Sequence, residues 1–479
     1  MLHVPILRWG QPYESVDKMV VPHFSTREPF VEISQANVGL IRRDLLRQAD
    51  ARQRLFEVNV EDLVLAAKAA AEHFVHGTLP VDPGRAITQS PQQYVEQVSA
   101  TTGMPWANVR RNMQKVHGVL SKVDEVIRGL TRGLDLDVLD RGLSDRNGQM
   151  ISFVPRAQAL GVVLPSNSPG VHSLWAPATV LKMPLVLKPG SAEPWTPLRI
   201  INAYLAAGVP PDAFGYYPSD HAGGNEILRA CGRGMVFGDT GSTRRWTADP
   251  RVEVHGPGYS KIVLGPDVAD RWPEYLEVMV ESIVNNGGRS CVNASGVWVT
   301  KHGDEIARAL AERLSHVEPL PLDHDDAILA PFADAGVAHR ISIVIDQDLA
   351  AAGDEGRATD VSAEVRGDAR VVSVQGGTFL LPTIVRADAG HPLANREFLF
   401  PFAAVVEVAP ERLPEGLGHS LVVTCISNDA RFREKFINSP LVDRLNLGAI
   451  PTTQIGWDQP HEGNLFDHLY ARRAIQRLA

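Results

Sequence analysis

The segment Asn285–Cys291 places a cysteine directly after a glycine-rich turn, and it is the part of the sequence best suited to covalent chemistry. Glycines let the backbone approach a ligand closely. A thiol held in such a turn becomes a strong nucleophile when positive charge or backbone N–H groups stabilise its thiolate. A lone cysteine is more often a small buried side chain, so Cys291 is a candidate nucleophile that needs support from the rest of the chain.

Two other segments carry polar groups where a strand is expected to end. In Leu164–Gly170 the amide of Asn167 could donate a hydrogen bond to an oxyanion on a substrate, although an Asn-Ser-Pro turn also caps helices. Lys188 stands at the carboxyl end of an expected parallel strand, the edge at which open α/β sheets bind ligands. A solvated lysine before a turn would look the same.

The remaining two segments are a glycine-rich turn and an isolated carboxylate. In Phe237–Ser242 an expected strand runs into a turn, beginning at Gly238, whose backbone N–H groups suit a pyrophosphate. The full G-x-G-x-x-G spacing is absent, which weakens that prediction. Glu397 precedes an apolar run that contains Phe400. On its own this segment resembles the ordinary start of a strand.

Helical periodicity dominates the first third of the chain. Apolar residues recur every three or four positions from Leu63 to Phe74, which predicts a helix that Asn59 caps. A longer apolar stripe from Val109 to Leu130 predicts a second helix with one face in a core.

From about residue 151 the pattern changes to short apolar runs separated by helix-length segments. Such alternation predicts βαβ units around a mostly parallel sheet. A second alternation follows residue 271, and the polar stretch 354–367 indicates a surface loop. The expected strands are 160–163, 185–187, 214–217, 235–237, 261–264, 296–300, 370–374 and 380–385, and the later expected helices are 272–283 and 305–314. We therefore expect two α/β domains joined near residues 256–270.

In this order and at these separations, the five segments resemble the signature segments of the aldehyde dehydrogenase superfamily. The resemblance covers about residues 30–460. It implies an α/β fold with a Rossmann-type cofactor domain, an α/β catalytic domain that carries the nucleophile, and a bridging hairpin used for oligomerisation. On this pattern we expect the NAD(P)-binding domain in residues 1–135 and 159–262, the catalytic domain in 263–445, and bridging segments in 136–158 and 446–479.

The resemblance also implies a mechanism. Cys291 would attack the aldehyde carbonyl to give a thiohemiacetal, and the amide of Asn167 with the Cys291 backbone N–H would form the oxyanion hole. Hydride would pass to NAD or NADP, leaving a thioester on Cys291. Lys188 and Glu397 would hold the two riboses of the cofactor, and Phe400, in the same segment as Glu397, is a further candidate cofactor contact.

The same resemblance assigns the pyrophosphate and bears on the choice of cofactor. Thr240 or Ser242 would contact the pyrophosphate. NAD-preferring members often carry an acidic residue three positions after the lysine, where this chain has Ser191. A serine leaves room for a 2′-phosphate, which favours NADP, although Glu193 lies two residues further and could swing in.

The sequence departs from the family at the glutamate that activates the deacylating water. Alignment puts Val254 or His255 at that position, preceded by Glu253. Members that pass the acyl group to coenzyme A also tend to lack this glutamate, because a thiolate needs less help from a base than water does. We therefore favour acyl transfer to or from coenzyme A, with an aldehyde or an acyl thioester as the small-molecule substrate. Alternatively, Glu253 or His255 replaces the base and a carboxylate is released, or His255 is only a hydrogen-bonded residue before a turn.

A catalytically silent structural or binding protein on the same fold is the alternative from a different class. It is disfavoured because the candidate nucleophile, oxyanion donor and ribose contacts are all present, although each serves a different step. The hairpin-like segment Gln149–Val162 resembles the bridging element, so a homodimer or homotetramer is expected. The polar residues His461 and Glu462 could line the mouth of the substrate site.

Composition limits the class and the compartment. The 479 residues include 47 Lys+Arg and 56 Asp+Glu, a net charge of −9 that argues against a nucleic-acid or anionic-membrane binder. Three cysteines make a poor disulfide framework and favour a reducing compartment. We find neither a signal peptide nor a stretch of about 18 apolar residues, so we expect a cytoplasmic protein without a membrane span. The 16 histidines form no pair at metal-ligand spacing on a helix face, and no metal site is expected.

Overall fold

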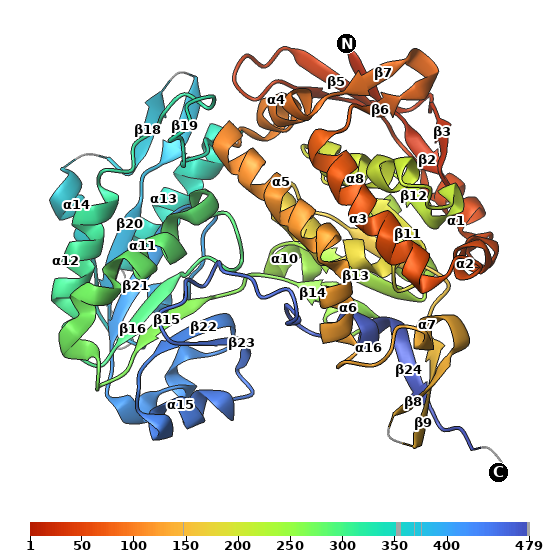
Figure 1. Ribbon diagram of the computed structural model, residues 1–479. Coiled ribbons are helices and arrows are strands. Elements are labelled where there is room, and N and C mark those ends of the chain that lie inside the picture. Colours follow the sequence, from red (N-terminus) through yellow and green to blue (C-terminus); the bar gives the residue numbers. More distant parts are fainter. Residues whose placement is uncertain (147, 351–355, 368, 375, 477–479) are drawn as a thin grey trace. The chain divides into compact units, whose positions relative to one another are not determined.

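The chain forms two compact units in the computed structural model, which describes residues 1–146, 148–350, 356–367, 369–374 and 376–476 (Figure 1). The first unit comprises Met1–Thr102, Val109–Gly256 and Gly456–Ala479, and the second comprises Gly103–Asn108 and Pro257–Ile455. The division after Gly256 lies slightly before the boundary expected at residue 262. The mixed α/β fold expected from the sequence is confirmed.

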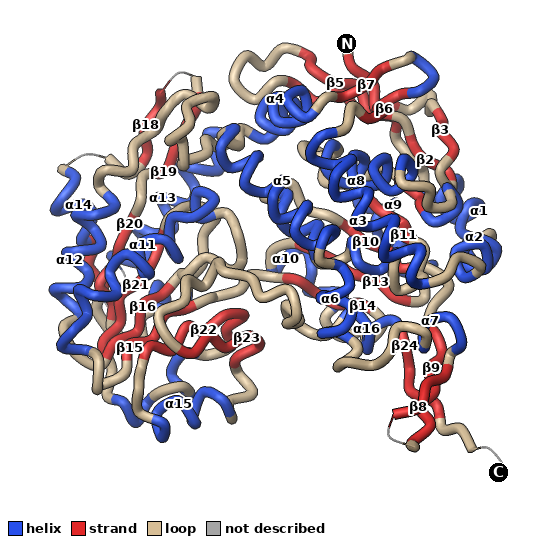
Figure 2. The backbone as a smooth tube through the Cα atoms, in the orientation of Figure 1, coloured by secondary structure: helices blue, strands red, loops and turns tan. Residues whose placement is uncertain are grey.

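The first unit is built around a seven-stranded sheet (Figure 2). Five neighbouring strands run parallel, and two N-terminal strands extend the sheet in antiparallel fashion. In order across the sheet they are β14 (Val252–His255), β13 (Arg233–Phe237), β10 (Leu160–Val163), β11 (Leu185–Lys188), β12 (Phe214–Tyr216), β2 (Ile6–Arg8) and β3 (Gln11–Tyr13). Apolar runs predicted the central strands because a parallel sheet buries both of its faces.

Helices cover both faces of this sheet. Val186 of β11 packs with Ile41 and Ile227, whereas Leu185 and Leu187 point to the opposite face because side chains alternate along a strand. The helices of this part of the chain are α1 (Val38–Leu45), α2 (Gln48–Phe56), α3 (Val60–His76), α4 (Pro91–Thr102), α5 (Trp106–Ser121), α6 (Val123–Leu130), α7 (Val138–Arg141), α8 (Trp195–Ala206), α9 (His221–Ala230), α10 (Thr240–Thr243) and α16 (Leu465–Leu469).

The two helices predicted in the first third of the chain differ in outcome. Helix α3 begins directly after Asn59 as expected, although that side chain makes no capping hydrogen bond. The stripe from Val109 to Leu130 is not one helix, because the backbone leaves helical geometry at Lys122, with φ −107° and ψ 24°. The stripe therefore covers most of helix α5 and the whole of helix α6.

The second unit contains another seven-stranded sheet, parallel except at one edge. Its strands in order are β17 (Ala358–Asp360), β20 (Thr383–Ala387), β21 (Phe402–Glu407), β16 (Gly296–Val299), β15 (Lys261–Leu264), β22 (Ser420–Ile426) and β23 (Val442–Leu447). Its helices are α11 (Leu276–Val284), α12 (Gly303–Leu314), α13 (Ala335–Ala350), α14 (Val361–Arg366) and α15 (Ala430–Ile437), and a hairpin joins β18 (Val371–Val374) to β19 (Gly377–Leu380).

Two sequence predictions in irregular regions are corrected by the structure. The segment 356–367 is not a plain surface loop, because it contains helix α14. Asp360 caps this helix, and Val361 in its first turn is buried. Residues 354 and 355 lie outside the described part. The hairpin also lies earlier than expected: β8 (Leu143–Arg146) pairs with β9 (Gln149–Pro155), and β24 (Tyr470–Arg473) joins them. Strand β10 belongs instead to the main sheet. Oligomerisation through this small sheet stays a prediction.

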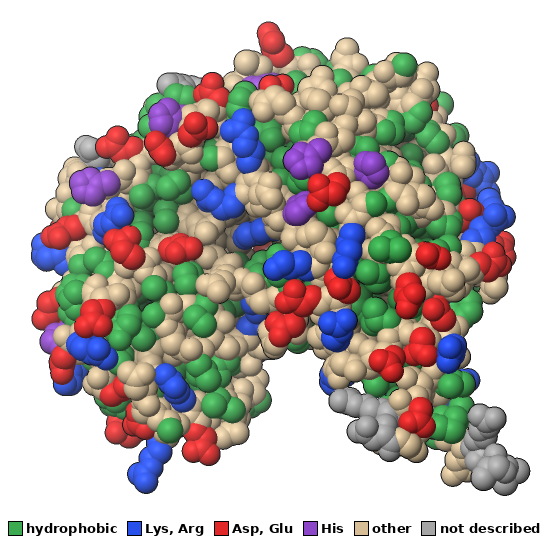
Figure 3. All heavy atoms as spheres, viewed as in Figure 1, with side chains coloured by type: hydrophobic (Ala, Val, Ile, Leu, Met, Phe, Trp, Pro, Cys, Tyr) green, Lys and Arg blue, Asp and Glu red, His purple; other side chains and the backbone are tan. Residues whose placement is uncertain are grey.

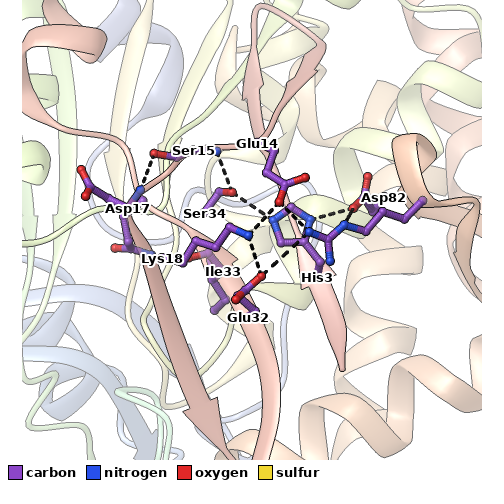
Figure 4. Close-up of polar contacts among 11 residues, drawn as sticks. His3, Glu14, Ser15, Asp17, Lys18, Glu32, Ile33, Ser34 and Asp82 are labelled. Atoms are coloured by element: carbon purple, nitrogen blue, oxygen red, sulfur yellow. Dashed lines mark hydrogen bonds and ion pairs between the residues drawn. The ribbon is translucent and has the colours of Figure 1, made fainter.

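A buried histidine connects the N-terminal strands β1 (Leu2–Val4) and β5 (Pro29–Ser34) to β6 (Leu79–Asp82) (Figure 4). His3 Nδ1 is hydrogen-bonded to the Asp82 carboxylate at 2.6 Å, and its Nε2 to the Ser34 hydroxyl at 3.0 Å. All three side chains are buried. Both ring nitrogens therefore have a partner within the protein.

Carboxylates beside His3 are neutralised by a cation of the chain itself. His3, Glu14 and Glu32 offer ligand atoms within 4.8 Å of one another. Lys18 Nζ already donates to both carboxylates, at 2.7 and 2.9 Å. The group is therefore an ion-paired cluster, and we do not assign a metal to it.

The surface agrees with the modest net charge. Acidic and basic side chains both occur across the face seen in Figure 3. Among the described helices, none has the length and apolar character that crossing a membrane requires.

Candidate active site

The loop that ends in Cys291 leaves helix α11 in a left-handed backbone course. Asn286, Gly287 and Gly288 have φ of 55°, 65° and 68°, a region that asparagine and glycine tolerate best. A Cβ at Gly288 would overlap the backbone of Phe400. The glycines are expected from the sequence to let a ligand approach the backbone. In the structure they instead allow another segment of the chain to pack closely against the loop, which fixes its course.

The side chain of Asn293 stabilises this loop through hydrogen bonds to its backbone. Its Oδ1 accepts from the Ser290 backbone N–H at 2.9 Å, and its Nδ2 donates to the carbonyls of Ser282 at 3.1 Å and Asn285 at 2.9 Å. Sequence analysis missed this residue, whose only signal is a buried amide two positions after the nucleophile. It positions Cys291 through the backbone.

Cys291 differs from the other two cysteines in its exposure. It is partly exposed and packs against the small cluster of Val292, Leu421 and Val422. Cys231 and Cys425 are buried, and burial raises the pKa of each thiol to about 12. Cys291 is therefore the cysteine best placed to react.

The segment Gly258–Ser260 brings Cys291 and Glu397 together. The Ser260 hydroxyl donates to the Cys291 carbonyl at 2.8 Å, and a Cβ at Gly258 would overlap that same carbonyl. The Tyr259 backbone N–H donates to Glu397 Oε2 at 2.7 Å. The predicted nucleophile and the predicted ribose contact thus lie against one short piece of chain.

A buried lysine and Glu397 share this neighbourhood. Burial raises the pKa of Glu397 to about 7, against the opposing effect of the N–H groups of Tyr259 and Gly258 and of the positive charge of Lys261. Burial likewise lowers the pKa of Lys261 to about 7. The Lys261 ammonium donates to the Tyr259 carbonyl at 2.8 Å and to the Ser420 hydroxyl at 3.2 Å. Sequence analysis did not single out Lys261, because it sits inside an apolar strand.

Phe400 is also placed in the second unit, where its side chain is buried. It is 3% exposed and packs in the core with Phe402, at a ring distance of 6.1 Å. Its side chain stabilises the region that carries Glu397, and its contact with a cofactor stays a prediction.

In the first unit, Asn167 and Lys188 follow the ends of neighbouring strands. Strand β10 ends at Val163, and the capping role in the next turn falls to Ser168, whose hydroxyl accepts from the Gly170 N–H at 3.3 Å. Asn167 is half-buried just before that cap. Lys188 ends β11 as predicted, and burial lowers its pKa while the negative charge of Asp220 opposes that effect.

The glycine-rich turn after β13 borders a cavity of about 740 Å³. Asp239 caps the turn by accepting from the Ser242 N–H at 2.7 Å, and a Cβ at Gly238 would overlap the Ser242 hydroxyl. Thr240 is exposed at the start of α10. Residues that line the cavity are His221, Gly241, Ser242, Arg244 and Arg245. Sequence analysis did not identify the two arginines, which give this cavity positive charge.

Ser191 and Glu193 behave differently from one another. Ser191 is exposed, which leaves its position open. Glu193 is 1% exposed; one oxygen accepts from the Thr196 N–H and hydroxyl, both at 2.8 Å, and the other is hydrogen-bonded to His172 Nε2 at 3.1 Å. The expectation that Glu193 could swing toward the ribose is therefore wrong.

The two candidate substitute bases lie on one face of β14. His255 Nδ1 is hydrogen-bonded to Glu462, its ring stacks on Phe237 with 4.5 Å between centroids, and its buried Nε2 has no hydrogen-bond partner among the described residues. Burial lowers the pKa of His255 to about 3 and raises that of Glu253 to about 7. Val254 faces the other way, into an apolar cluster.

Comparison with known families and structures identifies the class. Residues 83–412 match the model of the aldehyde dehydrogenase family, which covers more than half of the chain. The chain therefore belongs to this family and is an oxidoreductase that acts on aldehydes. A search of curated protein sequences finds no significant match.

Solved structures agree on the fold. Aldehyde dehydrogenase C of Pseudomonas syringae, determined with NAD+ and octanal, is 15% identical, with 98% of this chain and 96% of that one covered at a TM-score of 0.76. The aldehyde dehydrogenase KauB of Pseudomonas aeruginosa is 14% identical, with coverage of 99% and 96% and a TM-score of 0.76. An NAD-dependent aldehyde dehydrogenase of Sinorhizobium meliloti is 13% identical, with coverage of 99% and 94% and a TM-score of 0.73.

Proposed function

We propose that this chain is an NAD(P)-dependent aldehyde dehydrogenase that works through a covalent intermediate on Cys291. The observation that carries the proposal is the partial exposure of this one thiol at the end of a left-handed loop. A thiol with a pKa near 12, as Cys231 and Cys425 have, is almost wholly protonated at neutral pH and is a poor nucleophile.

The proposed reaction begins when the Cys291 thiolate adds to the aldehyde carbonyl. A C–S bond forms while the carbonyl π electrons move to oxygen, and the amide of Asn167 and the Cys291 backbone N–H stabilise the resulting oxyanion. Bound NAD(P) supplies the hydride acceptor. Loss of hydride from the carbon re-forms the carbonyl, now as a thioester on Cys291.

The residues of the first unit fit a dinucleotide. Lys188 ends a parallel strand, and the turn after β13 places Ser242 beside a cavity. We assign Lys188 and Glu397 to the riboses and Ser242 or Thr240 to the pyrophosphate.

Within this proposal we favour NADP over NAD. The acidic residue that would bind free ribose hydroxyls is replaced by Ser191, and Glu193 is held by other partners. Arg244 and Arg245 line the cavity, and a guanidinium suits the 2′-phosphate because it makes paired charge-assisted hydrogen bonds. Fluorescence titration should show tighter binding of NADP+ than of NAD+, with the preference reduced in Arg244→Gln/Arg245→Gln. Equal affinity of the wild type for both would contradict the assignment.

For deacylation we propose acyl transfer to coenzyme A. A histidine whose pKa is near 3 is too weak a base to activate water efficiently at neutral pH, and its Nε2 is buried. A coenzyme A thiolate needs less assistance from a base. The hydrolytic alternative would use Glu253, because burial brings its pKa to about 7.

Formation of reduced cofactor from a panel of aldehydes, measured by absorbance with and without coenzyme A, tests this assignment. We expect sustained turnover only with coenzyme A, and an acyl-coenzyme A product detected by mass spectrometry. Equal turnover without coenzyme A would contradict acyl transfer and leave the role of Cys291 intact. Glu253→Gln would then be the first variant to examine, with Glu32→Gln as its control.

A further inference from the structure

A guanidinium group lies on the strand next to the one against which the candidate nucleophile packs. Cys291 packs against the small cluster of Val292, Leu421 and Val422, the last two on strand β22. Arg444 of the edge strand β23 is the register partner of Val422. Register partners on neighbouring strands lie about 4.8 Å apart and direct their side chains to the same face. Arg444 is thus a lateral neighbour of a residue in the cluster that packs against Cys291.

The charges of Arg444 and Cys291 are coupled. Burial lowers the pKa of the Arg444 guanidinium, and the negative charge of the Cys291 thiolate opposes that effect. Attraction between two charges is mutual, so an interaction that favours the cation also favours the thiolate. The Arg444 Nη2 donates to the Gln454 carbonyl at 3.3 Å, which anchors the guanidinium in place.

Three other charged groups lie on the segments packed around this thiol, and each has another task. Arg289 donates to the backbone carbonyls of residues 330–331 at 3.1 and 2.7 Å. Lys261 and Glu397 are coupled to one another. Arg444, by contrast, interacts electrostatically with Cys291 itself.

We propose that Arg444 stabilises the thiolate form of Cys291 and so sets the fraction of the enzyme able to attack an aldehyde at neutral pH. This inference rests on the proposed role of Cys291 as the nucleophile. Removing a guanidinium from water costs free energy, and the thiolate offsets that cost. Once the acyl group is attached, the sulfur is neutral and the charge pair is lost.

The pH dependence of alkylation tests the inference. Iodoacetamide reacts with the thiolate, which displaces iodide, and the rate at Cys291 can be followed by peptide mass spectrometry on the full chain. We would compare the wild type with Arg444→Gln, which removes the charge, and Arg444→Lys, which retains it. Arg431→Gln, on the exposed surface of helix α15, is the control for the loss of one positive charge. Cys231 and Cys425 serve as unreactive internal references.

We expect the midpoint for wild-type Cys291 to lie below the ordinary thiol value of about 8.5. Arg444→Gln should raise it by about one pH unit, with the acid limb of kcat/KM moving in parallel. Arg444→Lys and Arg431→Gln should stay close to the wild type. An unchanged midpoint in folded Arg444→Gln would overturn the inference and leave the proposed function standing. Turnover by Cys291→Ser at the wild-type rate would instead overturn the proposed function.

Discussion

Two buried histidines in the first unit each form a hydrogen bond with a carboxylate, but they differ in whether the second ring nitrogen also has a partner. His3 has partners on both ring nitrogens, Asp82 at 2.6 Å and Ser34 at 3.0 Å. His255 is bonded to Glu462 through Nδ1, while its buried Nε2 has no hydrogen-bond partner among the described residues. The first pair connects N-terminal strands, and the second contains one of the two residues predicted as a substitute base.

The comparison shows two consequences of burial. Buried polar groups whose hydrogen bonds are all made stabilise the fold, whereas a buried carboxylate without a close cation has a shifted pKa. Around His3 the neighbouring carboxylates have cationic partners, and the hydrogen bond from Lys18 lowers the pKa of Glu32. Around His255, the neighbouring carboxylate of Glu253 lies 3.9 Å from His255 Nε2 and 3.7 Å from His468 Nδ1, both longer than the contacts of Lys18, and burial raises the pKa of Glu253 to about 7. A satisfied network stabilises the fold, whereas an unsatisfied one responds to pH.

The largest expected effect is on the satisfied pair. His3→Ala should lower the free energy of unfolding by about 3 kcal/mol, because it empties a buried site and removes the hydrogen bonds of the imidazole to Asp82 and Ser34. Urea unfolding measures this, with Lys301→Gln at an exposed ion pair as the control. Turnover per folded molecule should not change. A loss no larger than that of the control would show that the His3 network is not a structural tie.

The second effect concerns Glu253, the carboxylate beside His255, and depends on pH. The pKa of Glu253 is raised on folding, so its contribution to stability is present below about pH 4.5 and is lost as pH rises through about 7. Glu253→Gln should therefore stabilise the protein more at pH 8 than at pH 5, by a difference on the order of 2 kcal/mol. Unfolding curves at the two pH values measure this difference.

Glu32→Gln provides the opposite sign as a control. Its pKa is lowered by the hydrogen bond from Lys18, so the ionised form contributes stability that is lost as pH falls through the lowered value. The variant should therefore cost more stability at neutral pH than in acid. If both variants had the same pH slope, the contrast between the two regions would be unfounded.

Elements with strong local patterns could be predicted from the sequence, and those held by distant contacts could not. The central strands appeared as apolar runs because both faces are buried, as at Leu160–Val163. The break at Lys122 was hidden because the apolar stripe continues across it. Strand β17 and helix α14 were hidden by a polar composition that resembles a loop.

In the candidate site, too, residues beside a local sequence pattern could be predicted, and contacts between distant segments could not. Cys291 and Lys188 stand next to local signals, a glycine turn and a strand end, and were found from them. The hydrogen bond between His255 and Glu462 joins residues 207 positions apart, and no local sequence pattern around either residue predicts it. The proximity of Arg444 to Cys291 depends on strand register, which the sequence does not display.

The smallest expected effect tests whether Glu462 makes His255 a base. Under acyl transfer to coenzyme A, Glu462→Gln can retain the hydrogen bond to the ring and should leave coenzyme A-dependent turnover within about threefold of the wild type. Steady-state rates, with the melting temperature as a check on folding, measure this. A fall of about 100-fold in the folded variant, as expected for loss of a general base, would show that the His255–Glu462 pair acts as a base in turnover.

The most direct test of the central claim is formation of reduced cofactor by Cys291→Ser beside Cys425→Ser, with cofactor binding measured in both. The account predicts that Cys291→Ser binds cofactor normally and shows no measurable turnover, because a serine hydroxyl at neutral pH is a far weaker nucleophile than a thiolate. Cys425→Ser, changed at a buried thiol, should keep its turnover per folded molecule. Wild-type turnover by Cys291→Ser would contradict the account.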